Sequence, residues 1–186
     1  MGVDGNERLT AATGAVLIVL LAALGVTILS IGPLLWWHVL LGMLLIPPVL
    51  LKLASTGWRF VRYYRGRAEY VRRGPPVWWL RLSAPLVVLS TLFVFGTGVA
   101  LLATGPSGGI LVGLHKASFV IWFFLTALHV LGHLRELLPR RRIPGTSWRF
   151  AALAGSIAAG AILAALTVRY GQPWVHWMAG RHGGDG

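Results

Sequence analysis

Long apolar stretches separated by short polar or basic segments dominate the pattern along the chain. Between Leu9 and Leu51 there is no Asp, Glu, Lys or Arg. A helix that crosses a bilayer needs about 20 consecutive apolar residues. We therefore predict an all-α, integral membrane helical bundle that forms a single membrane domain over residues 1–186. Its five transmembrane helices are expected at about 11–31, 34–55, 83–104, 110–134 and 150–168, followed by a C-terminal tail at 171–186.

The connections between these spans alternate in character. The first connection is the Gly32-Pro33 pair and the third is TGPSGG at 104–109, both of which are typical of turns. The second connection, over residues 57–81, carries seven arginines, and the fourth, over 134–149, carries five. Basic loops stay on the cytoplasmic side of a membrane. We therefore predict a multi-pass protein of the cell (plasma) membrane with its N-terminus in the cytoplasm and its C-terminus outside.

The net charge of +12 raises the question of nucleic-acid binding. The arginines lie in loops between apolar spans, where the positive-inside rule places them, so we expect no nucleic-acid partner. Cysteine is absent from the chain, which excludes disulfides and thiolate-bound metal or iron–sulfur centres. The five acidic residues all lie outside the spans, which argues against a proton pump or an ion-coupled transporter.

Histidine is the unusual residue of the spans. His38 lies near the outer end of the second span, and His115 lies near the outer end of the fourth. The predicted topology puts both at a similar depth, and two facing imidazoles can clamp a haem iron between helices. The alternative is that both are polar side chains hydrogen-bonded inside the bundle. Because ionisable residues within a membrane are usually functional, we favour His38 and His115 as axial haem ligands.

A second haem is less clear from the sequence. His129 follows His115 by fourteen residues, which places it about 21 Å further along the helix and within about 40° of the same face. The position fourteen after His38 is Lys52, so no histidine on the second span matches His129. Lys52 could ligate iron when neutral, but snorkelling to the inner interface is the simpler explanation. His129 therefore belongs either to a second haem or to a quinone pocket, with Lys52 and His133 at its mouth.

These residues also carry a family resemblance. Over residues 34–138, through His38, His115 and His129, the chain resembles the prokaryotic cytochrome b561-type proteins and the cytochrome b subunits of formate dehydrogenases and nickel–iron hydrogenases. The resemblance implies a small bundle with a four-helix haem-binding core, in which haem b passes electrons between a partner subunit and quinone. It also implies an outer-face oxidoreductase partner of the molybdopterin or hydrogenase type. The chain departs from this pattern at Lys52.

We therefore expect an electron-transfer subunit of a respiratory complex, carrying one haem b and leaving a second open, rather than a stand-alone enzyme. Lys116 beside His115 is a candidate contact for haem propionates, although snorkelling explains it equally well. Gly42, Gly96 and Gly98 allow the close approach of a porphyrin, but helix packing is the simpler reason for them. The alternative function is a non-redox scaffold or assembly subunit whose histidines only pack.

Overall fold

The computed structural model describes residues 3–72, 74, 78–107, 109–132 and 147–182, and every regular element within these ranges is helical. The five long helices confirm the all-α transmembrane bundle, because each is long and apolar enough to cross a membrane. Their bounds are Val3–Leu29 for α1, Ile31–Tyr64 for α2, Trp78–Thr104 for α4, Gly109–Gly132 for α5 and Ser147–Thr167 for α7. The shorter elements are α3 (Ala68–Val71), η1 (Gly105–Ser107), η2 (Val168–Gly171) and α8 (Gln172–His182).

The second helix is longer than its predicted span. The sequence predicts an end near residue 55, whereas α2 continues to Tyr64. Gly57 lies within this stretch but does not end the helix, which stops shortly before Gly66, whose φ of 69° lies in the left-handed region that favours glycine. The first part of the basic segment is therefore a helical extension of the span, with Arg62 in its last turn.

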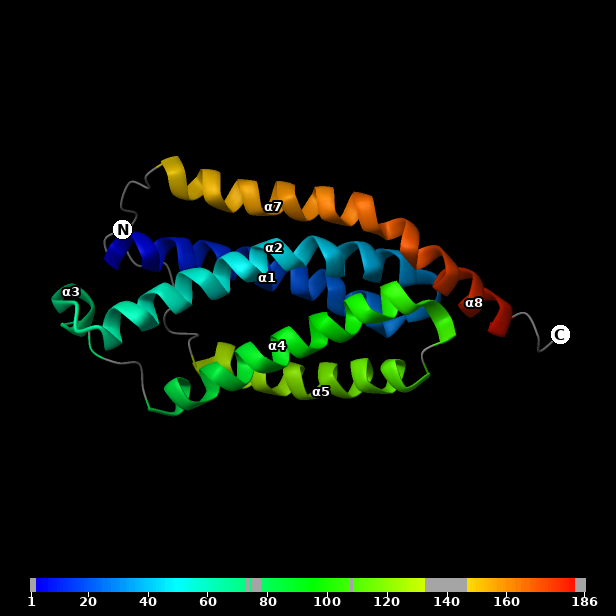
Figure 1. Cartoon of the computed structure of the whole chain (residues 1–186), viewed down its shortest axis with the longest axis horizontal. Helices are drawn as coiled ribbons and strands as arrows, with labels where there is room; N and C mark the ends of the chain where they lie inside the picture. The colour runs from blue at the N-terminus through cyan, green and yellow to red at the C-terminus, as the bar shows by residue number, and fades with distance from the viewer. Residues whose placement is uncertain (1–2, 73, 75–77, 108, 133–146, 183–186) are drawn as a thin grey trace.

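The helices form two groups that lie side by side (Figure 1). One group contains α1, α2 and α7, with α2 packed closely against both of the others. The second group is the hairpin of α4 and α5. Contacts between the groups are sparse and run mainly between α2 and α4. Only a few side chains therefore connect the two groups of long helices.

Proline shapes the contact between α2 and α7. The helix α2 runs through Pro47 and Pro48. Because Pro48 has no backbone N–H, the carbonyl of Leu44 loses its usual partner in the helix. Gly160 of α7 faces this carbonyl so closely that an added Cβ would lie 2.2 Å from the Leu44 oxygen. Only glycine lets α7 approach α2 at this point.

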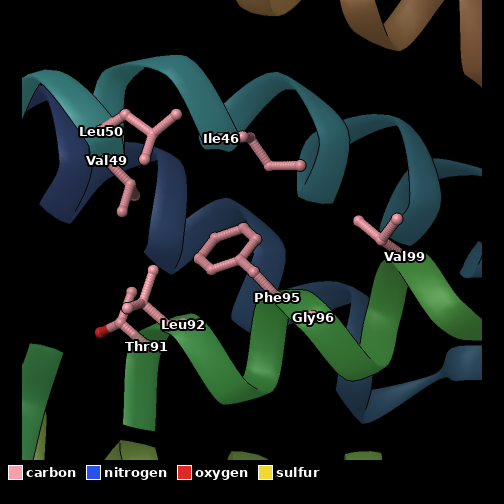
Figure 2. A pocket seen from close by; sticks show the side chains of 8 residues that line it. All are labelled: Ile46, Val49, Leu50, Thr91, Leu92, Phe95, Gly96 and Val99. Carbon is pink, nitrogen blue, oxygen red and sulfur yellow. The ribbon is translucent and has the colours of Figure 1, made fainter. Parts of the chain in front are cut away.

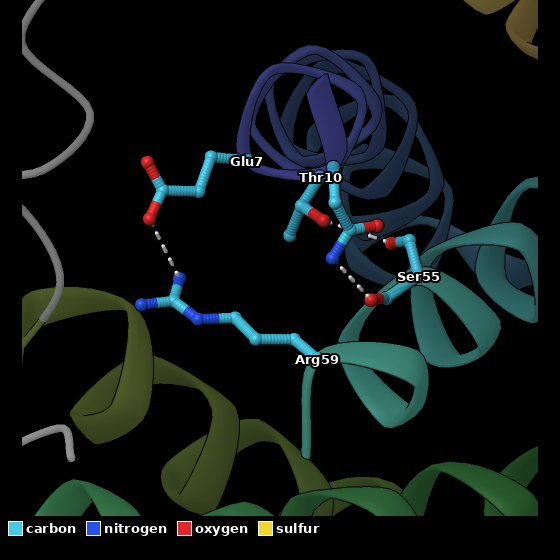
Figure 3. A network of polar contacts seen from close by, with 5 residues as sticks. Glu7, Thr10, Ser55 and Arg59 are labelled. Atoms are coloured by element: carbon cyan, nitrogen blue, oxygen red, sulfur yellow. Dashed lines mark hydrogen bonds and ion pairs between the residues drawn. The ribbon is translucent and has the colours of Figure 1, made fainter. Parts of the chain in front are cut away.

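A polar cluster ties α1 to α2 at the end of the bundle that carries the basic connections (Figure 3). Buried Asn6 donates from Nδ2 to the carbonyl oxygen of Ser55 at 2.9 Å. The hydroxyl of Thr10 donates to that of Ser55 at 3.0 Å. Glu7 and Arg59 form an ion pair at 3.5 Å. We call this the basic-loop end, and the opposite end, with the turns at Ser30 and Gly105, the short-turn end.

The C-terminal segment packs against the bundle. The ring of Trp174 in α8 is buried, and its indole N–H donates to the carbonyl of Leu101 in α4 at 2.9 Å. Trp174 therefore has a hydrogen-bond partner within the chain. The helix α8 thereby joins the two groups of helices at the short-turn end.

The outer surface of the long helices is apolar. Large side chains such as Leu29, Leu89, Ile110 and Phe124 are more than half exposed. Side chains of this kind are costly to expose to water over so wide a surface, and they suit the hydrocarbon region of a bilayer. The chain is a multi-pass membrane protein in which lipid covers these surfaces.

A candidate paired-imidazole site

The two histidines predicted to share a depth lie next to each other in the structure. His38 comes from α2, in the group of α1, α2 and α7, and His115 comes from α5, in the α4–α5 hairpin. Their ring centroids are 6.4 Å apart, and their planes are nearly perpendicular at 82°. The two imidazoles therefore meet across the boundary between the two groups of helices.

Each of these rings is held by a hydroxyl from the preceding long helix. Nδ1 of His38 lies 2.9 Å from Oγ1 of Thr27 in α1. Nδ1 of His115 lies 3.0 Å from Oγ1 of Thr97 in α4. With Nδ1 engaged on both rings, Nε2 is the nitrogen that remains for another ligand.

The separation of the rings fits a shared metal atom. A metal–imidazole bond is about 2 Å long, so two imidazoles on opposite sides of one iron have their centroids about 6 Å apart. The 6.4 Å between His38 and His115 agrees with this value. A pair of imidazoles is a ligand set that would hold a low-spin haem. Within the described residues no three His, Asp or Glu side chains come together, so a cluster-type metal site is not formed there.

Two of the three glycines singled out in the sequence border open space. An added Cβ at Gly42 or Gly96 would meet no atom within 4 Å among the described residues. Helix packing, the reason favoured from the sequence, therefore does not require glycine at these two positions. Gly98 differs, because an added Cβ would lie 3.2 Å from Cε1 of His115. The imidazole thus rests against the backbone of α4.

An apolar cavity of about 320 Å³ lies between α2 and α4 (Figure 2). Val49, which lines the cavity, lies on the helix face of α2 that also carries His38, because eleven steps of about 100° bring it within about 20° of the same direction. Gly96 of α4 contributes to the opposite wall. The cavity is lined by Ile46, Val49, Leu50, Thr91, Leu92, Phe95, Gly96 and Val99. Neither His38 nor His115 is among these lining residues, so it is the paired imidazoles, rather than this cavity, whose chemistry would fit a haem.

Towards the basic-loop end the arrangement changes. Nδ1 of His129 lies 3.0 Å from the hydroxyl oxygen of Ser83 in α4. Lys52 instead extends to α1, where its ammonium donates to the carbonyl of Thr10 at 2.7 Å and lies beside Gly14. The contacts described for these two side chains thus run to different helices.

Two further predicted residues complete the comparison with the sequence. Lys116 follows His115 in α5, and its side chain is exposed. His133 lies outside the described residues. The hydroxyls of Thr27, Thr97 and Ser83 were not predicted as part of the site. A signal for two of them is nevertheless present, because Ser83 and Thr97 are fourteen residues apart, as are His115 and His129.

Fold and site together define a five-span helical membrane protein with a pair of imidazoles between two groups of helices. Comparisons of the chain with protein-family models, with curated proteins and with solved structures found no match. The functional argument therefore depends on the geometry of the site.

Proposed function

We propose that this chain is a haem b subunit that transfers electrons between a redox partner on the outer face of the plasma membrane and the quinone pool. The observation that carries the proposal is the pair of His38 and His115, whose rings lie 6.4 Å apart with both Nδ1 atoms hydrogen-bonded. When bound, haem b supplies reversible one-electron transfer, and the protein sets its potential through axial ligands and burial.

In this proposal the chain's own residues have distinct tasks. His38 and His115 provide the axial nitrogens from the two groups of helices. The space beside Gly42 and Gly96 admits the porphyrin, and Lys116 is a candidate partner for its propionates. The short-turn end then faces the outside, which follows from the basic loops being cytoplasmic. An oxidoreductase subunit of the molybdopterin or hydrogenase type is the partner that the family resemblance implies.

The basic-loop half of the bundle is proposed as the quinone site. His129 offers a single imidazole there, and histidine can hydrogen-bond a quinone oxygen or relay a proton. Its hydrogen bond to Ser83 holds the ring against α4. Lys52 lies in the same half, but its ammonium is engaged with the Thr10 carbonyl. This arrangement supports one haem with a quinone site, rather than a second haem held by His129 and Lys52.

The decisive experiment is an optical spectrum of the purified chain in detergent. A reduced b-type α band is expected, and His38→Ala or His115→Ala should each abolish the low-spin signal. His176→Ala is the matched control, because His176 lies in α8 and should leave the spectrum unchanged. A colourless, fully helical preparation would refute the proposal and favour the scaffold or assembly subunit. A bis-histidine signature that persists in His38→Ala would refute the ligand assignment.

A further inference from the structure

Three hydroxyl side chains contact intramembrane imidazoles in the same way. Thr27 contacts His38 at 2.9 Å, Thr97 contacts His115 at 3.0 Å, and Ser83 contacts His129 at 3.0 Å. In each pair the imidazole nitrogen is Nδ1, and the hydroxyl comes from the long helix that precedes the one carrying the histidine. A contact repeated three times with the same nitrogen indicates a built feature of the bundle.

The direction of these hydrogen bonds follows from counting protons. A hydroxyl has one proton to donate. Thr27 donates its proton to the carbonyl of Leu24 at 2.5 Å, and Thr97 directs its proton to the carbonyls of Phe93 and Val94 at 3.0 Å. These are the back-bonds that Ser and Thr commonly form inside helices. The same oxygens can then only accept a hydrogen bond from the neighbouring imidazole.

The imidazole must therefore carry its proton on Nδ1. In a neutral ring the other nitrogen, Nε2, then has a free lone pair, which is the form that binds a metal. Ser83 follows the same logic, because it donates to the carbonyl of Leu80 at 3.2 Å. The pairs Thr97–His115 and Ser83–His129 are related by fourteen residues on both helices, so the antiparallel α4–α5 hairpin presents the same pair twice.

We propose that Thr27 and Thr97 are positioning residues that fix the tautomer and basicity of the His38 and His115 imidazoles. They thereby keep the midpoint potential of the haem low. This inference rests on the proposed function. A hydrogen bond from the non-ligating N–H raises the basicity of a metal-bound imidazole, and such partners typically alter metal affinity or activity about 10- to 100-fold. A more basic ligand stabilises ferric over ferrous iron.

The test compares Thr→Val, which removes the hydroxyl and keeps the shape, with Thr→Ser, which keeps the hydroxyl. In Thr27→Val the equilibrium ratio of ferric to ferrous haem should fall about tenfold. For a one-electron couple this change raises the midpoint potential by about 59 mV. Thr97→Val should raise the potential in the same direction, because the Thr97 hydroxyl contacts Nδ1 of His115 in the same way. Both Thr→Ser variants should restore the native potential.

A second readout does not depend on haem. Nitrogen-15 spectra of labelled histidines in the haem-free full chain report which ring nitrogen carries the proton. The native chain should show His38 and His115 protonated at Nδ1, and Thr27→Val should shift His38 towards the Nε2–H form. Thr167→Val is the control, because the Thr167 hydroxyl donates to the carbonyl of Leu163 in the same kind of back-bond on α7.

The possible results separate the two proposals. A native chain that binds no haem would refute the proposed function. A native chain that binds haem, with both Thr→Val variants matching Thr167→Val in potential and in histidine tautomer, would refute the positioning role and leave the proposed function standing. A shift in potential that Thr→Ser fails to restore would show that side-chain packing, rather than the hydroxyl, is responsible, and would also overturn the inference.

Discussion

Replacing His129 with alanine separates the two halves of the proposed electron route. His129 and His115 belong to one continuous helix, α5, and are fourteen residues apart. At about 1.5 Å per residue they are about 21 Å apart along the helix axis. The rings of His38 and His115 are only 6.4 Å apart. His129 therefore cannot ligate the haem that this pair holds.

The expected result has two parts. Haem content stays at one per chain in His129→Ala, and the low-spin spectrum is unchanged. Oxidation of the reduced haem by an added quinone slows by about 10²-fold or more, which is the usual contribution of a positioned acid–base group. The lost hydrogen bond to Ser83 should lower the free energy of unfolding by about 1 kcal/mol, which is too little to unfold the bundle.

The assay is haem extraction per polypeptide, followed by stopped-flow oxidation of the reduced protein by a soluble quinone. Ser83→Ala is a useful companion, because it removes only the partner of His129 and should give an intermediate rate. A native chain with two haems, of which His129→Ala loses one, would refute the single-haem argument. An unchanged oxidation rate would remove His129 from the quinone site.

Two other predictions concern the paired site and its orientation. Gly98→Ala places a Cβ 3.2 Å from Cε1 of His115, so the ring must shift and the low-spin electron paramagnetic resonance signal should broaden or weaken. Gly113→Ala, whose Cβ would meet nothing within 4 Å, should leave that signal unchanged. A topology reporter fused after Arg73 should be active in the cytoplasm, and one at the C-terminus should be exposed outside. The reverse pattern would contradict the placement of the haem near the outer face.

The fold was largely predictable because its signal is local. Apolar runs of about 20 residues, interrupted by Gly32-Pro33 and by the arginine-rich segments, predict the five spans without any knowledge of packing. The helix α2 continues beyond its predicted span, because hydropathy reports where lipid ends and not where a helix ends. Gly66, with its positive φ, terminates the helix well beyond the apolar stretch.

The candidate site was predictable only in part. The proximity of His38 and His115 follows from topology, since both lie near the same ends of their spans. The hydroxyls that hold them were missed, because Thr and Ser are common in membrane helices and their role depends on which helix lies next to which. These hydroxyl–imidazole contacts form because α1 packs against α2 and α4 packs against α5. Which helices pack together cannot be read from a single sequence.

Lys52 occupies the position at which a second pair of hydroxyl and imidazole would be expected from the packing of α1 against α2. In the α1–α2 hairpin, stepping fourteen residues from Thr27 and His38 leads to Thr13 and Lys52. Thr13 is fully buried and donates its proton to the carbonyl of Leu9 at 2.7 Å, as Thr27 does to its own helix. The oxygen of Thr13 is thus able to accept from an imidazole at position 52. By register, the basic-loop half thus repeats the hydroxyl positions of the paired site but has Lys52 in place of one imidazole.

Lys52→His should therefore create a second haem site with His129. Haem content should rise from one to two per chain, and the double variant Lys52→His/His129→Ala should return it to one. Lys52→Met is the control, because it removes the ammonium without adding a ligand and should leave haem content at one. In the native chain Lys52 donates to the carbonyl of Thr10. Both substitutions at position 52 remove this hydrogen bond, so its loss cannot explain a difference between them. A folded Lys52→His chain that still holds one haem would contradict this prediction. It would show that a histidine at position 52 does not reproduce the geometry of the His38–His115 pair, although the spacing of fourteen residues is the same.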